Sequence, residues 1–231
     1  MNIIVTGATK GIGKAIAATF SAEGHTLFLC ARNENELKET AASFISLFGN
    51  KVFIYVADLS KKAEVIAFGK WCLEFGTPDI LVNNAGRFLP GSIYNENDGI
   101  LEEMIETNLY SAYHLTRTIV PTMIKQQSGH VFNICSIASV KPYSNGGSYG
   151  ISKFAMLGFS KNLREELMQH KVKVTAVLPG AVYTESWSGS GVEPTRIMED
   201  QDIATMILAA SKLSPQACVE EILLRPQLGD L

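Results

Sequence analysis

A tyrosine and a lysine, Tyr149 and Lys153, are separated by three residues in the sequence Tyr-Gly-Ile-Ser-Lys. On a helix, residues at this spacing are neighbours on one face. A phenol hydroxyl normally titrates near pH ~10 and is therefore a weak proton donor or acceptor at neutral pH. A nearby ammonium favours the phenolate and moves a phenol toward the range in which general acid–base catalysis operates. The pair indicates proton-transfer chemistry, although the same spacing also occurs on solvated helix faces.

The elements that must position this pair are short apolar runs that alternate with longer amphipathic segments. Runs that are apolar almost throughout are typical of strands covered on both faces. They occupy residues 3–5, 27–29, 52–56, 80–82, 131–134, 172–177 and 222–224. Helical patterns occupy residues 12–22, 34–48, 61–75, 100–125, 149–170 and 202–210. This alternation predicts a single α/β domain over residues 1–231, with a parallel sheet and helices on both of its faces.

The composition excludes several classes of protein. The 231 residues are 46% apolar, and 20 basic and 23 acidic side chains give a net charge of -3, which argues against a nucleic-acid-binding face or a polybasic membrane anchor. No apolar stretch approaches the ~18 residues of a membrane span, and the first residues lack the basic region of a signal peptide. The scattered cysteines and histidines predict buried thiols in a reducing compartment and no bound metal. We therefore expect a cytoplasmic protein.

A glycine-rich segment follows the first predicted strand and opens the first helix. Residues 6–13 have the sequence Thr-Gly-Ala-Thr-Lys-Gly-Ile-Gly. Glycines let a backbone approach a pyrophosphate, and a helix N-terminus supplies oriented N–H donors. The spacing differs from Gly-x-Gly-x-x-Gly, and a tight strand–helix turn alone would also need such glycines. The segment predicts a dinucleotide site that uses Gly7, Thr9, Lys10, Gly11, Ile12 and Gly13.

The end of the second strand indicates which dinucleotide binds. NAD-specific sites usually place a carboxylate there, whereas a basic residue accommodates the 2′-phosphate of NADP. The acidic position holds Ala31, followed by Arg32, and Lys10 lies in the glycine-rich segment. These residues favour NADP(H) over NAD(H). After the third strand, Asp58 and Leu59 are candidates to contact the adenine, although Asp58 could equally be a turn residue or an N-cap.

Further polar residues come where other predicted strands end. Asn-Asn-Ala-Gly follows the fourth strand at residues 83–86, and Ser136 ends the fifth. Open α/β sheets bind ligands at this carboxyl edge. Asn108 lies inside the helical pattern 100–125, where asparagine has a mediocre propensity, and a side-chain hydrogen bond that opens the helix would explain it.

Taken together, these motifs resemble the short-chain dehydrogenase/reductase family in its compact form. The resemblance covers residues 2–184 and rests on the segments already named and on Pro-Gly-x-x-x-Thr at residues 179–184. It implies a Rossmann-like, doubly wound sheet of seven parallel strands in the order 3-2-1-4-5-6-7. It also implies a homodimer or homotetramer in which the helices at 100–125 and 149–170 pair between subunits.

The resemblance also implies roles for individual residues. Tyr149 would exchange a proton with a carbonyl oxygen, Lys153 would support it and hold the nicotinamide ribose, Ser136 would bind the substrate oxygen, and Asn108 would hold a water. The further cofactor-binding residues it implies are Asn83, Ala85, Gly86, Pro179, Gly180, Val182 and Thr184, together with Tyr149 and Lys153.

A loop-like segment at about residues 184–201 is expected to form a short substrate flap. Candidate aromatic residues of the pocket are Phe88, Tyr94, Tyr143, Tyr183 and Trp187. Residues 180–184 and 219–230 are also similar to bacterial sepiapterin-reductase-like proteins, although no pterin-binding residue is assigned.

The sequence therefore predicts an NADPH-dependent reductase of a small carbonyl substrate, or a dehydrogenase in the reverse direction. The alternatives are a pteridine or diketone reductase of the sepiapterin-reductase type, and a non-catalytic NADP-binding sensor. An epimerase or dehydratase of the longer related type would need a larger domain after the sixth strand.

Overall fold

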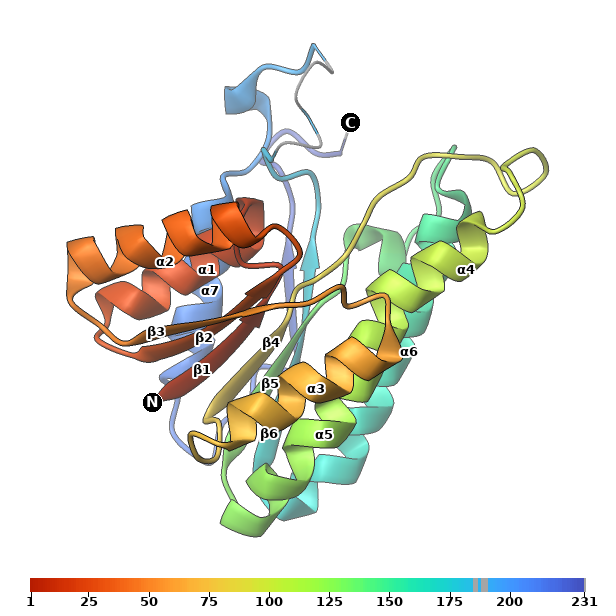
Figure 1. Cartoon of the computed structure of the whole chain (residues 1–231). Helices are drawn as coiled ribbons and strands as arrows, with labels where there is room; N and C mark the ends of the chain where they lie inside the picture. Colours follow the sequence, from red (N-terminus) through yellow and green to blue (C-terminus); the bar gives the residue numbers. More distant parts are fainter. Residues whose placement is uncertain (185–186, 188–190, 231) are drawn as a thin grey trace.

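A computed structural model of the chain describes residues 1–184, 187 and 191–230. Its centre is a parallel sheet of seven strands in the order β3-β2-β1-β4-β5-β6-β7, with helices on both faces (Figure 1). The strands are β1 (Asn2–Thr6), β2 (Thr26–Ala31), β3 (Val52–Val56), β4 (Ile80–Asn83), β5 (Gly129–Ile134), β6 (Val172–Pro179) and β7 (Glu221–Leu224). The predicted fold class, strand order and strand positions are confirmed.

Strand β1 lies in the middle of the sheet, and its side chains alternate between two cores. Ile3 and Val5 face the layer of α1 (Gly11–Ala22), α2 (Glu34–Phe48) and α7 (Asp200–Ser211). Ile4 faces the opposite layer. Because both faces of each central strand are covered, the strands are apolar at nearly every position, which is why they appear as continuous apolar runs.

The opposite layer contains α3 (Lys62–Leu73), α5 (Ser111–Gln126) and α6 (Gly147–Leu167) (Figure 1). It is built around a cluster that includes Phe68 of α3 and Leu115 of α5. Met156 and Leu157 of α6 pack with Leu178 of β6 in a smaller cluster. None of the helices that the structure describes is long and apolar enough to cross a membrane.

The predicted helix at 100–125 is not continuous. It consists of α4 (Ile100–Ile105), a π-helical turn at Glu106–Tyr110 and α5. The extra residue of a π turn breaks the regular ladder of backbone hydrogen bonds, and such turns are frequent at functional sites. Asn108 lies inside the turn, so the expectation that this asparagine opens the helix is confirmed.

The segment predicted as a flap is described only in part. Residues 185–186 and 188–190, which carry most of its glycines and serines, lie outside the described residues. A short helical turn covers Pro194–Arg196, and α7 begins at Asp200, inside the range predicted for the flap. The Arg196 guanidinium donates hydrogen bonds to the carbonyl oxygens of Leu228, Gly229 and Asp230, at 3.4, 3.1 and 3.2 Å. This arginine ties the C-terminal segment to the end of the predicted flap.

Candidate active site

The glycine-rich loop is compact because its glycines adopt backbone angles and close contacts that a side chain would prevent. Gly7 and Gly11 have left-handed φ angles of 63° and 48°, which L-residues rarely adopt. A Cβ atom on Gly13 would collide with the carbonyl oxygen of Gly7 and with the amide of Asn84. The N-terminal end of α1 therefore opens directly onto the loop, with backbone N–H groups available to an anion.

Thr6 and Asn84 fasten this loop to the end of β4. The Thr6 hydroxyl donates to the carbonyl oxygen of Val82 at 3.2 Å and accepts from the backbone N–H groups of Asn84 and Ala85, both at 2.9 Å. The Asn84 amide donates to the carbonyl oxygens of Thr6 and Gly7, at 2.8 and 3.1 Å. These bonds join two strand ends into one rigid floor.

The two asparagines of the Asn-Asn-Ala-Gly motif have different surroundings. The Asn83 side chain is buried and donates to the Thr116 hydroxyl at 3.0 Å and to the Asn133 amide oxygen at 2.9 Å. The Asn83 side chain therefore lies in the core and does not line the cleft, where its predicted role in cofactor binding would place it. Asn84, which sequence reasoning did not select, is the one that reaches the glycine-rich loop.

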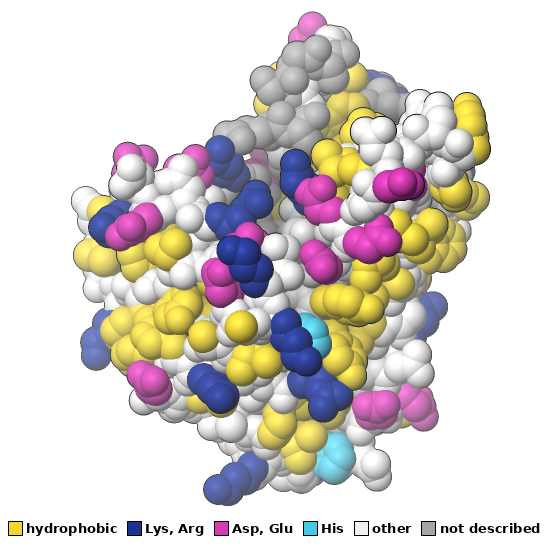
Figure 2. Space-filling view, turned by 45° about the vertical axis from the view of Figure 1, so that its right-hand side comes forward, with side chains coloured by type: hydrophobic (Ala, Val, Ile, Leu, Met, Phe, Trp, Pro, Cys, Tyr) yellow, Lys and Arg dark blue, Asp and Glu magenta, His cyan; other side chains and the backbone are white. Residues whose placement is uncertain are grey.

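A cleft of about 890 Å³ runs along the carboxyl edge of the sheet. Figure 2 shows this face hollowed between two lobes, with basic and acidic side chains around the hollow. The predicted cofactor residues that line the cleft are Gly7, Thr9, Lys10, Gly11, Ile12, Gly13, Arg32, Asp58, Leu59, Ala85, Gly86 and Thr184. The lining also includes residues that sequence reasoning did not assign, among them Cys30, Glu36, Arg87 and Thr107.

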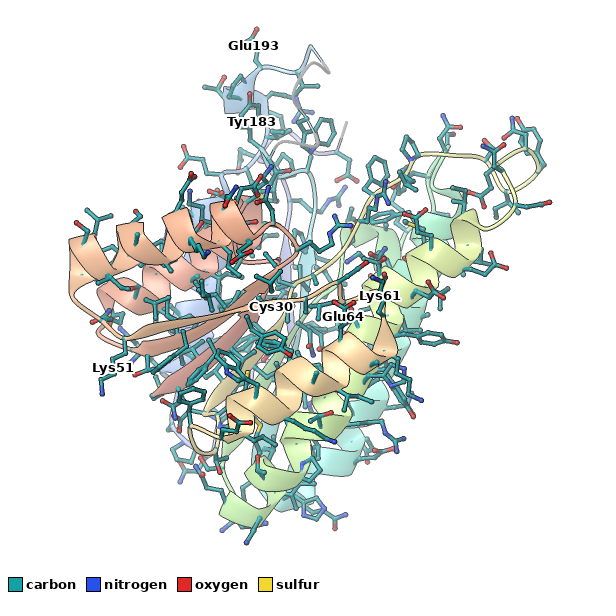
Figure 3. The ribbon with its side chains drawn as sticks, in the orientation of Figure 1. Cys30, Lys51, Lys61, Glu64, Tyr183 and Glu193 are labelled. Carbon is teal, nitrogen blue, oxygen red and sulfur yellow. The ribbon has the colours of Figure 1, made fainter. Side chains whose placement is uncertain are left out.

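Basic and acidic groups meet at the end of the cleft next to β2. The Lys10 ammonium lies 3.2 Å from the Glu36 carboxylate, and both side chains are partly exposed. Arg32 is exposed and lines the same end. Cys30 lies at the end of β2 below this region (Figure 3), and burial raises the pKa of its thiol to about 12, so it is an uncharged wall of the cleft.

Asp58 is held as a carboxylate at the neighbouring strand end. Burial alone would raise its pKa, but hydrogen bonds from the hydroxyl and backbone N–H of Ser60, together with Lys61 and Arg32, keep the pKa below its usual value. The two Ser60 bonds measure 2.8 and 3.1 Å. Lys61 also lies 3.2 Å from the Glu64 carboxylate, and both are seen at the start of α3 in Figure 3. An ionised Asp58 is a suitable acceptor for an amino group.

Asn108 connects the π turn to both sides of the cleft. Its amide oxygen accepts from the backbone N–H of Arg87 at 2.7 Å, and its amide nitrogen donates to the Arg87 carbonyl oxygen at 3.0 Å. The same nitrogen donates to the Ser152 hydroxyl at 2.9 Å, and Ser152 donates to the carbonyl oxygen of Tyr149 at 2.7 Å. Asn108 is only 1% exposed, so this chain is shielded from competing water.

Tyr149 and Lys153 lie one turn apart on α6, as their spacing predicts. The Lys153 ammonium is buried, donates to the carbonyl oxygen of Ile134 at 2.9 Å and lies 5.8 Å from the centre of the Tyr149 ring. A Cβ atom on Gly86 would lie 3.7 Å from this ammonium and 3.3 Å from the amide oxygen of Asn108. Lys153, Asn108 and Gly86 therefore meet at one point of the cleft.

Ser136 lies two residues after Ile134, the last residue of β5, whose carbonyl oxygen accepts from Lys153. It is 9% exposed, and its hydroxyl oxygen accepts from the backbone N–H of Ala138 at 3.1 Å. A hydroxyl that accepts one bond keeps its proton available for donation. The structure thus holds the Ser136 oxygen in place at the same edge of the sheet.

Two of the candidate aromatic residues, Phe88 and Tyr143, lie close to Tyr149, whereas Tyr94 is exposed to solvent and Tyr183 lies elsewhere. Phe88 packs edge-on against Tyr149 with ring centres 4.9 Å apart, and burial, with Tyr149 close by, raises the pKa of Tyr143 to about 12. Tyr94 is 88% exposed and lies in solvent. Tyr183 is 40% exposed and lies above the sheet near Glu193 in Figure 3.

The segment after β6 contributes Thr184 to the cleft, but its preceding residues lie elsewhere. The Gly180 N–H donates to the Leu224 carbonyl oxygen at 2.7 Å, and the Val182 side chain is buried in the core. Pro179 is the last residue of β6 and pairs with Leu224. The predicted cofactor residues Pro179, Gly180 and Val182 are thus part of the β6–β7 end and do not line the cleft.

The arrangement combines a cleft along the strand ends with a phenol, a buried ammonium and a held hydroxyl, and the ammonium lies next to Gly86 of the cleft lining. Such a set can bind a nucleotide along the strand ends and exchange a proton with a substrate oxygen. Among the described residues, no group of three or more histidine, cysteine or acidic side chains is arranged to hold a metal ion.

Known proteins match this chain over nearly its whole length. A sequence model described as short chain dehydrogenase matches residues 1–193. An uncharacterized oxidoreductase of Staphylococcus epidermidis is 32% identical over 224 residues, 96% of each chain. A metagenomic short-chain oxidoreductase in complex with NADP is 31% identical, with a TM-score of 0.86 over 98% of this chain and 97% of that one. An alcohol dehydrogenase from Thermococcus sibiricus, complexed with 5-hydroxy-NADP, is 28% identical, with a TM-score of 0.90 over 98% and 96%.

Proposed function

Since the chain belongs to the short-chain dehydrogenase family, we propose that it is an NADP(H)-dependent oxidoreductase that interconverts a small carbonyl compound and its alcohol. One observation carries the proposal. The buried Lys153 ammonium lies beside the Tyr149 ring. The same ammonium lies next to Gly86, which lines the cleft together with the glycine-rich loop. Among the described residues this ammonium has no carboxylate partner, which is unusual for a buried lysine, and its positive charge would stabilise negative charge that develops nearby during proton transfer.

The cleft fits a phosphorylated dinucleotide. A Cβ atom on Gly11 would lie 2.8 Å from the Thr184 side chain, so the bare glycine lets Thr184 approach the start of α1, where a pyrophosphate would bind. Lys10 and Arg32 would hold the 2′-phosphate, and Asp58 would accept from the adenine amino group. Both solved structures compared above are complexes with NADP or a derivative of it, which supports NADP(H) over NAD(H).

The proposed proton transfer uses the donors of the chain itself. NADPH, when bound, supplies the hydride. Tyr149 donates its hydroxyl proton to the substrate oxygen as negative charge develops there, and Ser136 donates a hydrogen bond to the same oxygen. Lys153 then stabilises the phenolate; its bond to Ile134 uses one of three N–H groups, which leaves two for the ribose or for water.

Asn108 would complete this chain of groups. Among the described residues its amide oxygen accepts only from the Arg87 N–H, and a carbonyl oxygen has a second lone pair. We assign that lone pair to a water that would reprotonate the Lys153–Tyr149 pair. Thr184, the first residue of the predicted flap, lines the cleft and would contact the bound cofactor.

Substitution of Tyr149 by Phe tests the proposal. The hydroxyl is lost while the ring and its contact with Phe88 remain, so NADPH binding should persist. NADPH oxidation should fall by about two to four orders of magnitude on the substrate that the wild type turns over best. The substrate is found with a panel of aldehydes, ketones, diketones, keto-esters, sugars and pteridines.

Two results would contradict this function. Turnover by Tyr149→Phe at the rate of the wild type would remove the phenol from the mechanism. NADPH binding by the wild type without oxidation on the whole panel would favour the non-catalytic sensor instead.

We also propose that the protein is a homodimer or homotetramer. Large apolar side chains are exposed where α5 and α6 meet solvent: Tyr113, Ile151 and Phe154 are 37%, 41% and 46% exposed. Exposed apolar faces of this kind mark association surfaces. Light scattering of the wild type and of Phe154→Glu measures the subunit number, and a monomeric wild type would refute the assembly.

A further inference from the structure

The loop that follows β4 returns to the start of α6 and is fastened there. The Gly91 N–H donates to the Asn145 carbonyl oxygen at 3.1 Å, and the Ser92 hydroxyl donates to the Asn145 amide oxygen at 2.8 Å. Asn145 has a left-handed φ of 60°, a conformation that asparagine tolerates better than most residues. This contact brings residues 91–96 against the helix that carries Tyr149.

Glu96 is the charged residue of that contact. The Ser148 hydroxyl donates to one oxygen of its carboxylate, and the Ser148 backbone N–H donates to the other at 3.4 Å. Ser148 is 1% exposed, so these bonds are shielded from water. Among the described residues, Glu96 forms no ion pair with a basic side chain. The carboxylate therefore has the α6 N-terminus as its partner.

The start of α6 needs such a partner. The residue before the helix is Gly146, which has no side chain to accept from the first backbone N–H groups. These groups are otherwise unsatisfied, and the helix dipole places partial positive charge there. Glu96 satisfies one of them and adds a compensating negative charge, although it lies 52 residues earlier in the chain.

The fit around this carboxylate is tight. Gly147 has a left-handed φ of 32°, and a Cβ atom there would lie 2.9 Å from the Glu96 carboxylate. Tyr149 follows Ser148 directly, and Phe88 of the same loop packs edge-on against the Tyr149 ring at 4.9 Å. The loop after β4 thus holds Tyr149 both through the helix backbone and through its ring.

We propose that Glu96 is a positioning residue for Tyr149, an inference that rests on the proposed function. Its carboxylate fixes the first turn of α6, so that the phenol stays aligned with Lys153 and with the substrate oxygen. Without it, the unsatisfied first turn frays and the phenol shifts. A displacement of about 1 Å can lower a rate by roughly 100-fold even when the displaced group is intact.

The test compares four single variants and one double variant with the wild type. Glu96→Ala removes the acceptor, Glu96→Gln keeps an amide oxygen that can still accept from Ser148, and Ser148→Ala removes the side-chain donor. Glu165→Gln is the matched control, because it removes an exposed carboxylate near the other end of α6. Circular dichroism and thermal unfolding confirm that each variant is folded before kinetics are measured.

Glu96→Ala should lower kcat by about 10- to 100-fold while the Kd for NADPH changes by less than about two-fold. Glu96→Gln should recover a large part of kcat, and Glu165→Gln should match the wild type. The double variant Glu96→Ala/Ser148→Ala should be no slower than Glu96→Ala alone, because both remove one contact.

Different failures have different meanings. An active wild type with an equally active, folded Glu96→Ala variant overturns the inference and leaves the proposed function intact. Absence of turnover in the wild type overturns the proposed function. In that case, hydrogen exchange of the amides of residues 147–153 still tests the positioning: faster exchange in Glu96→Ala supports it, and unchanged exchange overturns it.

Discussion

His130 makes the stability of the sheet depend on acid. It is 5% exposed on β5, and its Nε2 lies 2.8 Å from the Thr175 hydroxyl, which itself donates to the Val219 carbonyl oxygen at 2.6 Å. Because the Thr175 proton is already used, Nε2 is the donor in this contact. Burial, with Lys173 nearby as a smaller cause, lowers the pKa of His130 to about 3.

The direction of the effect follows from linkage. An unfolded histidine has a pKa near 6.5, so between pH ~6.5 and ~3 the unfolded chain binds a proton that the folded chain excludes. The contribution is complete above pH ~6.5 and is lost as pH falls. At 1.36 kcal/mol per unit, the free energy of unfolding should drop by about 1.4 kcal/mol at pH 5.5 and about 2.7 kcal/mol at pH 4.5, relative to pH 7.5.

Urea unfolding of the wild type and of His130→Gln at these three pH values measures the loss. Gln keeps an amide N–H for Thr175 but does not titrate, so the difference in unfolding free energy between the two proteins should shift by the amounts given above. A difference that stays constant from pH 7.5 to 4.5 would refute the reasoning, because it would mean that the buried imidazole takes up a proton as easily as a free one.

Three other residues give separate predictions. Arg32→Ala should weaken NADPH binding by about 10-fold through the loss of one charge-assisted hydrogen bond, with NADH binding unchanged, as measured by fluorescence titration; equal losses for both cofactors would exclude a 2′-phosphate contact. Asn108→Leu leaves the backbone N–H and carbonyl of Arg87 without their side-chain partner, so urea unfolding should show a free energy of unfolding lower by about 2–4 kcal/mol. A change within about 0.5 kcal/mol would contradict the hydrogen bonds described. Arg196→Met should release the C-terminal segment to carboxypeptidase, followed by mass spectrometry with Arg117→Met as the control, and equal digestion of both variants would show that Arg196 does not hold it.

The strands could be predicted because burial on both faces leaves a local trace in the sequence. Ile3 to Val5 and Ile80 to Val82 are apolar at every position for this reason. The helix at 100–125 and an irregularity at Asn108 could both be predicted, but the π turn itself could not, since it depends on where the Asn108 side chain finds partners. Those partners, Arg87 and Ser152, are 21 and 44 residues away.

In the candidate site too, local sequence patterns could be predicted and contacts between distant residues could not. The glycine-rich segment and the Tyr149–Lys153 pair are local patterns whose spacing has a physical meaning, and the structure brings them to one edge. Asn84 and Glu96 were not found, because their partners Thr6 and Ser148 are 78 and 52 residues distant. A contact between residues so far apart in the chain produces no periodic pattern from which it could be predicted. The core position of Asn83 is hidden for the same reason.

The central position of β1 has a consequence for how the chain is made. One edge of β1 pairs with β2, but the other pairs with β4, whose first residue is Ile80, and the Asn2 N–H donates to Asp79 at 2.6 Å. At a synthesis rate of about 5–20 residues per second, roughly 4 to 15 seconds separate the emergence of the two strands from the ribosome. During that interval an apolar strand has an open edge, which is a template for aggregation. The sheet can therefore close around β1 only after β4 has been made.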